Sequence, residues 1–305
     1  MKVLYEGVDI YPDISVNQCF HEMYAEGHTD ELIIRFNDTR GRWDEWGPKE
    51  GDAIQVTEGN ADTGKMFIKS VSPENGVYTL RAYSMPIEAM NTSSKSWEQV
   101  RLLQLCDEIA GRLGLALDTY GLTDHNYQFV SKANQTDLCF LQQRCRMEGA
   151  AFLIYDGRLV VYDEKTIEAE EPAKTVTIGS DTEFEMSDNT SRAAGTAVVT
   201  NGTISGQFSA GNGTQVIRQA VPAYMENEAE AARYAAGALR NANKGLFTVI
   251  VWQPKIVANI AAGSVVAVTG ETVMSWAGPM FVYRVRHDYE QRQSKIFMRR
   301  PLEGY

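Results

Sequence analysis

One strand pattern occurs twice in this chain, once near each end. The first copy reads GDAIQV at 51–56 and GKMFIKSV at 64–71, and the second reads GSVVAV at 263–268 and GPMFVYRV at 278–285. Companion strand patterns precede each copy at 32–36 and 248–252 and follow each copy at 77–81 and 294–299. The pattern predicts two similar β modules in which Met66 and Met280 are equivalent. A duplicated module favours a symmetric assembly over chemistry.

Composition allows two or three soluble domains. The chain has 305 residues, of which 44% are hydrophobic and 23% are charged. Its net charge of -11 argues against a surface that binds the nucleic acid backbone, because such binding requires clustered Lys and Arg. The acidity fits either ordinary solubility or the wall of a lumen past which DNA slides.

The cysteines and the chain start indicate a cytosol-like compartment. None of Cys19, Cys106, Cys139 and Cys145 forms a CxxC pair, so we expect reduced core residues. Charged residues interrupt the apolar run at the N-terminus, and no later stretch has the length of a membrane span. No stable membrane association is therefore expected.

The fold class that the patterns predict is mainly β (α+β). Short strands with Gly-rich turns, such as Asn75-Gly76, favour a small barrel or sandwich over 1–88 and again over 168–305. The middle, 89–167, predicts a compact α+β unit. We expect one helix from a capping box at Ser96 to Gly114, and a second from Thr136 to Gly149.

Further elements follow those helices. The clearest hairpin joins 151–155 to 159–162 through Asp156-Gly157. An acidic stretch at 164–175 predicts a solvated linker. In the second β domain, we expect a long loop at 201–213 and an Ala-rich helix at 228–243 that packs on a sheet.

The segments that resemble motifs for catalysis or metal binding each lack a required residue. The segment 59–65 is similar to a phosphate-binding loop, but Met66 stands where Ser or Thr must reach magnesium, and a strand pattern follows. His21-Glu22 begins like a zinc protease motif, but Ala25 occupies the second histidine position. His28, His125 and His287 are isolated and predict structural or exposed roles. Site residues are therefore predicted as none, whether catalytic, cofactor-binding or metal-ligating.

Two observations leave alternatives open. No Gly-x-Ser-x-Gly elbow occurs and no carboxylate pair stands out, although a glycosidase pair assembled in three dimensions is not excluded by sequence. Trp43 and Trp46 favour a plug closing the barrel or a protein interface, with a sugar contact as the alternative.

The chain resembles the baseplate hubs of contractile phage tails, the late control protein D family, and their relatives in phage-tail-like bacteriocins. The likeness spans nearly the whole chain. The residues that carry it are 43–47, 51–52, 109–110, 114–115, 135–137, 140–141, 263–266 and 283–287.

The resemblance implies two tail-tube-like β-barrel domains that flank an inserted α/β region. It implies a homotrimer whose six barrels form a pseudo-hexameric ring, a structural symmetry adaptor that joins the hexameric tail tube to the trimeric spike. The N-terminal half of type VI secretion spike proteins has a similar plan. Because the chain ends at Tyr305 just after the second barrel, and no lysozyme or peptidase insertion is recognised, a separate spike protein is expected.

The resemblance also implies the partners and location. Expected partners are the tail tube, spike and baseplate wedge proteins and the tape measure protein, with no sequence-specific nucleic acid and no cofactor. We expect assembly in the bacterial cytoplasm and a final place in the tail baseplate of a virion or tail-like particle. The competing functions are a tail-tip cell-wall hydrolase and a β-rich carbohydrate-binding module; the leading one is not an enzyme.

Overall fold

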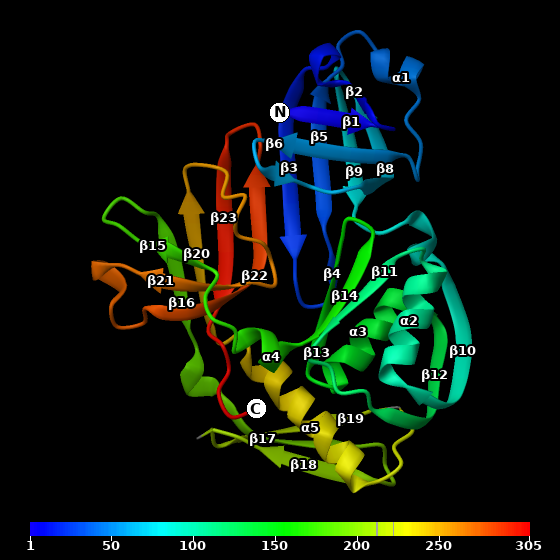
Figure 1. The fold of residues 1–305 in the computed structure, drawn as a ribbon, viewed down its shortest axis with the longest axis vertical. Coiled ribbons are helices and arrows are strands. Elements are labelled where there is room, and N and C mark those ends of the chain that lie inside the picture. Colours follow the sequence, from blue (N-terminus) through cyan, green and yellow to red (C-terminus); the bar gives the residue numbers. More distant parts are fainter. Residues whose placement is uncertain (212, 222) are drawn as a thin grey trace.

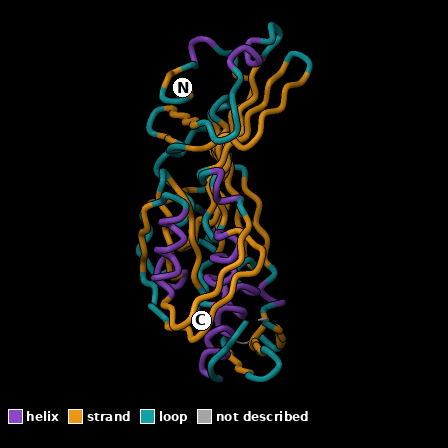
Figure 2. Tube along the Cα trace, turned by 90° about the vertical axis from the view of Figure 1, so that its right-hand side faces the viewer, coloured by secondary structure: helices purple, strands orange, loops and turns teal. Residues whose placement is uncertain are grey.

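The computed structural model describes residues 1–211, 213–221 and 223–305 of the chain. In these residues strands predominate over helices and form four sheets, the largest of which has 14 strands (Figure 1). The molecule is elongated, with the N-terminal strands at one end and most of the helical chain toward the other (Figure 2). The mainly β fold class is therefore confirmed.

Two groups of strands in the large sheet correspond to the two sequence copies. The first module, with order β3-β5-β9-β8-β6-β1, consists of β1 (Lys2–Tyr5), β3 (Val16–Tyr24), β5 (Glu31–Asn37), β6 (Ala53–Glu58), β8 (Met66–Glu74) and β9 (Val77–Tyr83). The second module, with order β16-β20-β23-β22-β21-β15, consists of β15 (Lys174–Thr177), β16 (Phe184–Asp188), β20 (Phe247–Gln253), β21 (Val265–Thr269), β22 (Gly278–Asp288) and β23 (Gln293–Arg299). The short strands β2 (Val8–Asp9) and β7 (Ala61–Asp62) pair antiparallel with β1 and β6, respectively.

The modules share strand order and register. Met66 pairs with Ile54, and Met280 pairs with Val266. The next ladder skips one residue between Ile68 and Ser70 in the first module and between Val282 and Arg284 in the second. The equivalence of Met66 and Met280 predicted by the repeat is therefore confirmed.

The turn that starts each copy is also repeated. Gly51 and Gly263 have φ of 93° and 89°, a region that L side chains rarely adopt. Their N–H groups donate to the carbonyls of Ile68 and Val282, both at 2.8 Å. The modules differ at one edge, because β1 is antiparallel to β6 whereas β15 is parallel to β21.

The modules are joined edge to edge. The second half of β22 pairs with β3, so one continuous sheet runs through both modules. In the described part of the chain, no sheet closes on itself by hydrogen bonding. Each module has its own buried core, with Ile34, Phe36 and Met66 in the first and Val249, Met280 and Val282 in the second.

The middle of the chain is an α+β unit around a third core. Its elements are β10 (Thr92–Arg101), α2 (Leu102–Arg112), β11 (Ala116–Tyr120), β12 (Asn126–Thr136), α3 (Asp137–Met147), β13 (Ala150–Tyr155), β14 (Arg158–Asp163) and α4 (Glu164–Glu168). The short strand β4 (His28–Thr29), from the N-terminal part of the chain, pairs with β13. The Thr136 side chain caps α3 by accepting from the Cys139 N–H, which confirms the start predicted for that helix. The predicted hairpin is β13–β14, with φ of 44° at Asp156 and 74° at Gly157.

Two predictions for this region are wrong. The helix expected from Ser96 begins at Leu102, because 92–101 form a strand that pairs with β12. Residues three apart in a regular strand point to opposite faces, yet Trp97 and Val100 are both buried. Gln99, between them, has a φ of 50°, so the strand is irregular at this point. The expected solvated linker begins as α4, in which Glu164 and Glu168 are buried while Lys165 and Thr166 are exposed; most of the residues from 169 to 175 are exposed.

A small sheet with one long helix completes the fold. It contains β17 (Ala194–Thr200), β18 (Ser205–Ser209), β19 (Gln215–Ala220) and α5 (Glu228–Asn243). The α5 bounds match the prediction, and its Ala231 and Ala235 pack on β17 and β18. The loop expected at 201–213 contains strand β18, because residues 205–209 pair with β17; Asn212 lies outside the described residues. None of the described helices has the length and apolarity needed to span a bilayer.

The remaining elements are short. They are α1 (Arg42–Trp46), η1 (Tyr11–Asp13), η2 (Ile87–Met90), η3 (Thr190–Arg192) and η4 (Glu271–Val273).

Candidate functional site

The junction between the modules is an antiparallel ladder between β3 and β22. His21 lies opposite His287, and Met23 lies opposite Val285. His21, Val285 and His287 are all buried. A charged row flanks this apolar seam, since Glu22 pairs with the guanidinium of Arg284 at 2.6 Å. The junction therefore has the burial of a domain core.

The charges at the junction are matched. Burial would raise the pKa of Glu22, but its hydrogen bond with Tyr24 and the two cations Arg284 and Arg286 outweigh that effect and lower it. The Arg284 guanidinium also lies over the ring of Phe297, at 4.5 Å from the centroid. The ion pair of Glu22 with Arg284 stabilises the pairing of β3 with β22, and the contact of Arg284 with Phe297 connects β22 to β23.

The buried histidines do not form a metal site. His287 Nδ1 shares a hydrogen bond of 2.8 Å with Ser294 Oγ, and His21 Nε2 lies 3.8 Å from Asp30 Oδ2. Burial lowers the pKa of His287 to about 3, with the neighbouring His21 as the second cause. Among the described residues, no three His, Cys, Asp or Glu side chains are grouped to hold a metal ion.

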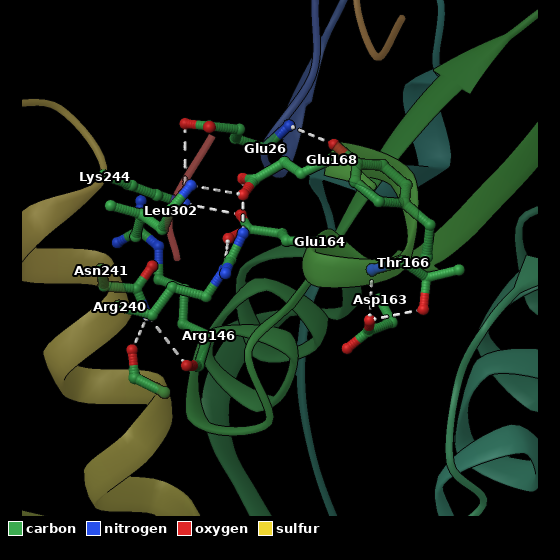
Figure 3. Close-up of polar contacts among 12 residues, drawn as sticks. Glu26, Arg146, Asp163, Glu164, Thr166, Glu168, Arg240, Asn241, Lys244 and Leu302 are labelled. Atoms are coloured by element: carbon green, nitrogen blue, oxygen red, sulfur yellow. Dashed lines mark hydrogen bonds and ion pairs between the residues drawn. The ribbon is translucent and has the colours of Figure 1, made fainter. Parts of the chain in front are cut away.

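A cluster of six charged side chains of both signs lies where four parts of the chain meet. We call it the charge cluster; its members are Glu26, Glu164, Glu168, Arg240, Lys244 and Arg299. Figure 3 labels five of them, Glu26, Glu164, Glu168, Arg240 and Lys244. Glu164 accepts from Arg240 Nε at 2.8 Å and from Lys244 Nζ at 2.6 Å. Arg299 of β23 donates to Glu26 at 2.7 Å and pairs with Glu168 at 2.5 Å. The cluster connects the second module, α4, α5 and the turn after β3.

The two carboxylates of α4 in this cluster are not an acid–base pair. Burial would raise the pKa of Glu164, but the charges of Lys244, Arg299 and Arg240 outweigh it and lower the pKa. Glu168 also accepts the N–H of Leu302 at 3.0 Å. A general acid for glycoside hydrolysis needs a raised pKa, so Glu164 does not suit that role, and its ion pairs indicate a structural one.

The two tryptophans predicted as a plug or an interface divide between these roles. Trp43 is buried and packs on Phe36 and Tyr78, with ring centroids 4.3 Å and 5.5 Å away, so it closes the end of the first core. Trp46 is 45% exposed and lines a hollow of about 690 Å³ that also contains Arg42 and Asp38. Trp46 is therefore available to a partner.

Other residues that the sequence singled out have structural surroundings. Residues 59–65 form the connection between β6 and β8, with Met66 buried at the start of a strand. Burial is the largest cause that lowers the pKa of His28 and of His125. Cys19, Cys106 and Cys145 are buried free thiols, whereas Cys139 is exposed, contrary to the expectation of a core residue.

Two sheet edges that the sequence did not indicate are open within the described residues. Strand β16 pairs with β20 on one side and ends the large sheet. The outer half of β8, residues 70–74, pairs with β9 on one side, since β6 reaches only Met66 and Phe67. Both segments are exposed. We call them the open edges. The alternation of Phe184 and Met186 in an otherwise polar strand was the available signal.

No protein-family model matches the sequence, and a comparison with curated proteins finds none that is similar. Solved structures do resemble it. A tail protein from Neisseria meningitidis has a TM-score of 0.74 and 12% identity, with 98% of this chain and 95% of that one covered. The 43 kDa tail protein of prophage MuSo2 from Shewanella oneidensis has a TM-score of 0.71 and 11% identity, with 98% and 97% covered.

A third similar structure comes from a secretion system. The E. coli c3393 protein, described as a component of the type VI secretion system with structural similarity to the T4 tail proteins gp27 and gp5, has a TM-score of 0.64 and 10% identity. The match covers 100% of this chain and 79% of that one. The chain therefore has the baseplate hub-like fold shared by these phage tail and type VI secretion proteins.

Proposed function

We propose that the protein is a trimeric baseplate hub that joins a hexameric tail tube to a trimeric spike. The observation that carries the proposal is the repeat of one strand order and register in two modules of one chain. Three copies of such a chain present six similar modules on one side while keeping threefold symmetry elsewhere. That combination is what a sixfold tube and a threefold spike require of an adaptor.

The proposal assigns roles to the parts of the chain. Residues 1–88 and 168–305 are the two tube-like domains, each barrel-like in the assembled ring, and 89–167 is the inserted unit between them. The tail tube, spike, baseplate wedge and tape measure proteins are the proposed partners. Assembly takes place in the bacterial cytoplasm, before the hub takes its place in the tail baseplate.

We infer that the role is not enzymatic. The buried carboxylates Glu164 and Glu168 of the charge cluster are paired with cations, and the buried His287 shares a hydrogen bond with Ser294. Loss of turbidity from a peptidoglycan suspension on addition of the protein would contradict this inference and favour a tail-tip hydrolase.

The assembly can be tested directly. Mass photometry of the purified protein, alone and with the spike encoded beside it, is expected to show three copies per particle. Electron microscopy class averages are expected to show six lobes around a hole with threefold symmetry. Single-copy particles in both samples would overturn the proposal.

Carbohydrate binding is the second candidate, because Trp46 is exposed beside a hollow with charged and polar residues. Flat aromatic rings next to hydrogen-bonding groups suit sugar contacts. Binding on a glycan array that is lost in Trp46→Ala would support this candidate; an array without binding would remove it.

A further inference from the structure

We propose that β16 of one chain pairs antiparallel with residues 70–74 of β8 in the next copy, so that the contact between copies repeats the internal contact of β3 with β22. The inference rests on the proposed trimer and specifies which surfaces close its ring. Its basis is the internal repeat: each open edge is the equivalent of a strand that is paired at the module junction.

Strand β16 is the equivalent of β3. In the first module His21 lies opposite Leu32 of β5, which lies opposite Ala82 of β9. In the second module Met186 lies opposite Val249 of β20, which in turn lies opposite Met298 of β23. Ala82 and Met298 are themselves equivalent, because they face Ile68 and Val282. Met186 therefore occupies the position of His21, and Phe184 occupies that of Cys19.

The outer half of β8 is the equivalent of the part of β22 that pairs with β3. Because Met66 and Met280 are equivalent and both strands skip one residue at the same place, Val71 corresponds to Val285. By the same count Pro73 corresponds to His287.

At equivalent positions, the residues at the module junction are buried and the residues on the open edges are exposed. Cys19, His21 and Val285 are 0% exposed. His21 and Val285 belong to the ladder that joins the modules, and Cys19 lies two residues before His21 on the same strand. Their counterparts Phe184, Met186 and Val71 are 37%, 41% and 36% exposed. Phe184 and Met186 are two apart on a strand, so they point to one face. These apolar side chains are therefore exposed at positions whose counterparts are buried where the two modules are joined.

The occupant is a second copy rather than another protein, because each chain carries one edge of each kind. Edges that are complementary but unlike give a head-to-tail contact, and such contacts form a closed ring when the rotation closes. A contact like the internal one makes successive modules equivalent around that ring. The row of unpaired backbone groups on each edge is satisfied in the same step.

The internal register fixes the proposed one. The internal pair of His21 with His287 corresponds to Met186 opposite Pro73 in the proposed contact. The internal pair of Glu22 with Arg286 corresponds to Ser187 opposite Ser72. Pro73 has no N–H to donate, so this contact has one fewer backbone donor than the internal one. The arrangement also brings Glu185 opposite Glu74, whose carboxylate already accepts from Arg35 at 3.1 Å. That cation offsets the repulsion between the two carboxylates.

Disulfide trapping tests the register. In a Cys139→Ser background, which removes the exposed native thiol, chains with Ser72→Cys are mixed with chains with Ser187→Cys and oxidised. We expect a covalent dimer from the mixture and a covalent trimer from the double variant. Each single variant, and Ser72→Cys mixed with Ser209→Cys on the unrelated strand β18, should stay monomeric on a non-reducing gel.

A charge substitution tests the surface. Met186→Arg is expected to raise the concentration at which trimers form by about tenfold or more, because a desolvated charge would lie in the contact. Val216→Arg is the matched control, since Val216 is an exposed aliphatic residue on another edge strand, β19. Equal effects of the two variants would overturn the proposed surface. Unchanged circular dichroism establishes that each variant is folded.

The outcomes separate this inference from the proposed function. Threefold particles without the trapped dimer would overturn the β16–β8 pairing and leave the trimeric hub standing. Single-copy particles without trapping, both alone and with the spike, would overturn both.

Discussion

His21 and His287 face each other across the ladder that joins the two modules, with ring centroids 6.3 Å apart. Both are buried, and the ring of Tyr289 is stacked on that of His21, with the ring centroids 6.4 Å apart. Two imidazoles in one apolar seam tolerate each other only while at least one is neutral. The stability of the junction should therefore depend on pH.

We expect the free energy of unfolding to fall as the pH falls below about 6.5. Burial and His21 lower the folded pKa of His287 to about 3, whereas an unfolded His titrates near 6.5. Between these values the unfolded chain binds more protons, so stability rises with pH, by at most about 1.4 kcal/mol per pH unit. His287→Gln should flatten the curve between pH 5 and 7 in chemical denaturation. A slope unchanged from the wild type, or flattened equally by His125→Gln at the less buried site, would contradict the assignment.

We expect Arg299→Met to destabilise the fold by about 3–5 kcal/mol, because Glu26 and Glu168 would lose a buried cation. Urea denaturation measures the effect. Arg101→Met is the matched control, since Arg101 pairs with Asp124 at 3.3 Å from an exposed position; little change is expected there. A small effect at both positions would show that the charge cluster does not hold the modules and α5 together.

Local signals predicted the repeat well. Each copy begins with a glycine that needs positive φ, and alternation then places Met66 and Met280 inward. These features depend on neighbours along the chain, so the pattern alone was sufficient to pair the copies.

Features that depend on distant residues were not predictable in this way. Residues 96–101 were predicted as the start of a helix from their local spacing, but pairing with the distant strand β12 makes them part of a strand. The acidic residues Glu164 and Glu168 looked solvated because their cations, Arg240 and Arg299, come from far along the sequence. The open edges follow from the order of strands in the sheet, which the alternation of Phe184 and Met186 alone does not reveal.

We expect Gly237→Ala to destabilise the contact of α5 with α3. A Cβ at this position would lie 2.4 Å from the carbonyl oxygen of Met147, so the helices must separate, with an expected loss of about 1–3 kcal/mol. Gly111→Ala in α2 is the control, because its added Cβ would meet no described atom within 4 Å. That variant should be neutral or more stable by up to about 1 kcal/mol. Thermal unfolding distinguishes the two, and equal melting temperatures would contradict the close approach.

We expect Trp43→Ala and Trp46→Ala to separate stability from binding. Trp43 is buried against Phe36 and Tyr78, so its truncation should reduce stability by about 3–5 kcal/mol. Trp46 is exposed beside the hollow, and its ring centroid lies 5.3 Å from that of Trp43, so its truncation should change stability much less. If Trp46 contacts a baseplate partner, co-purification with tube or spike protein should weaken in Trp46→Ala at unchanged stability. Comparable losses of stability in both variants would mean that the whole of α1 is a plug, because the exposed ring would then be part of the core.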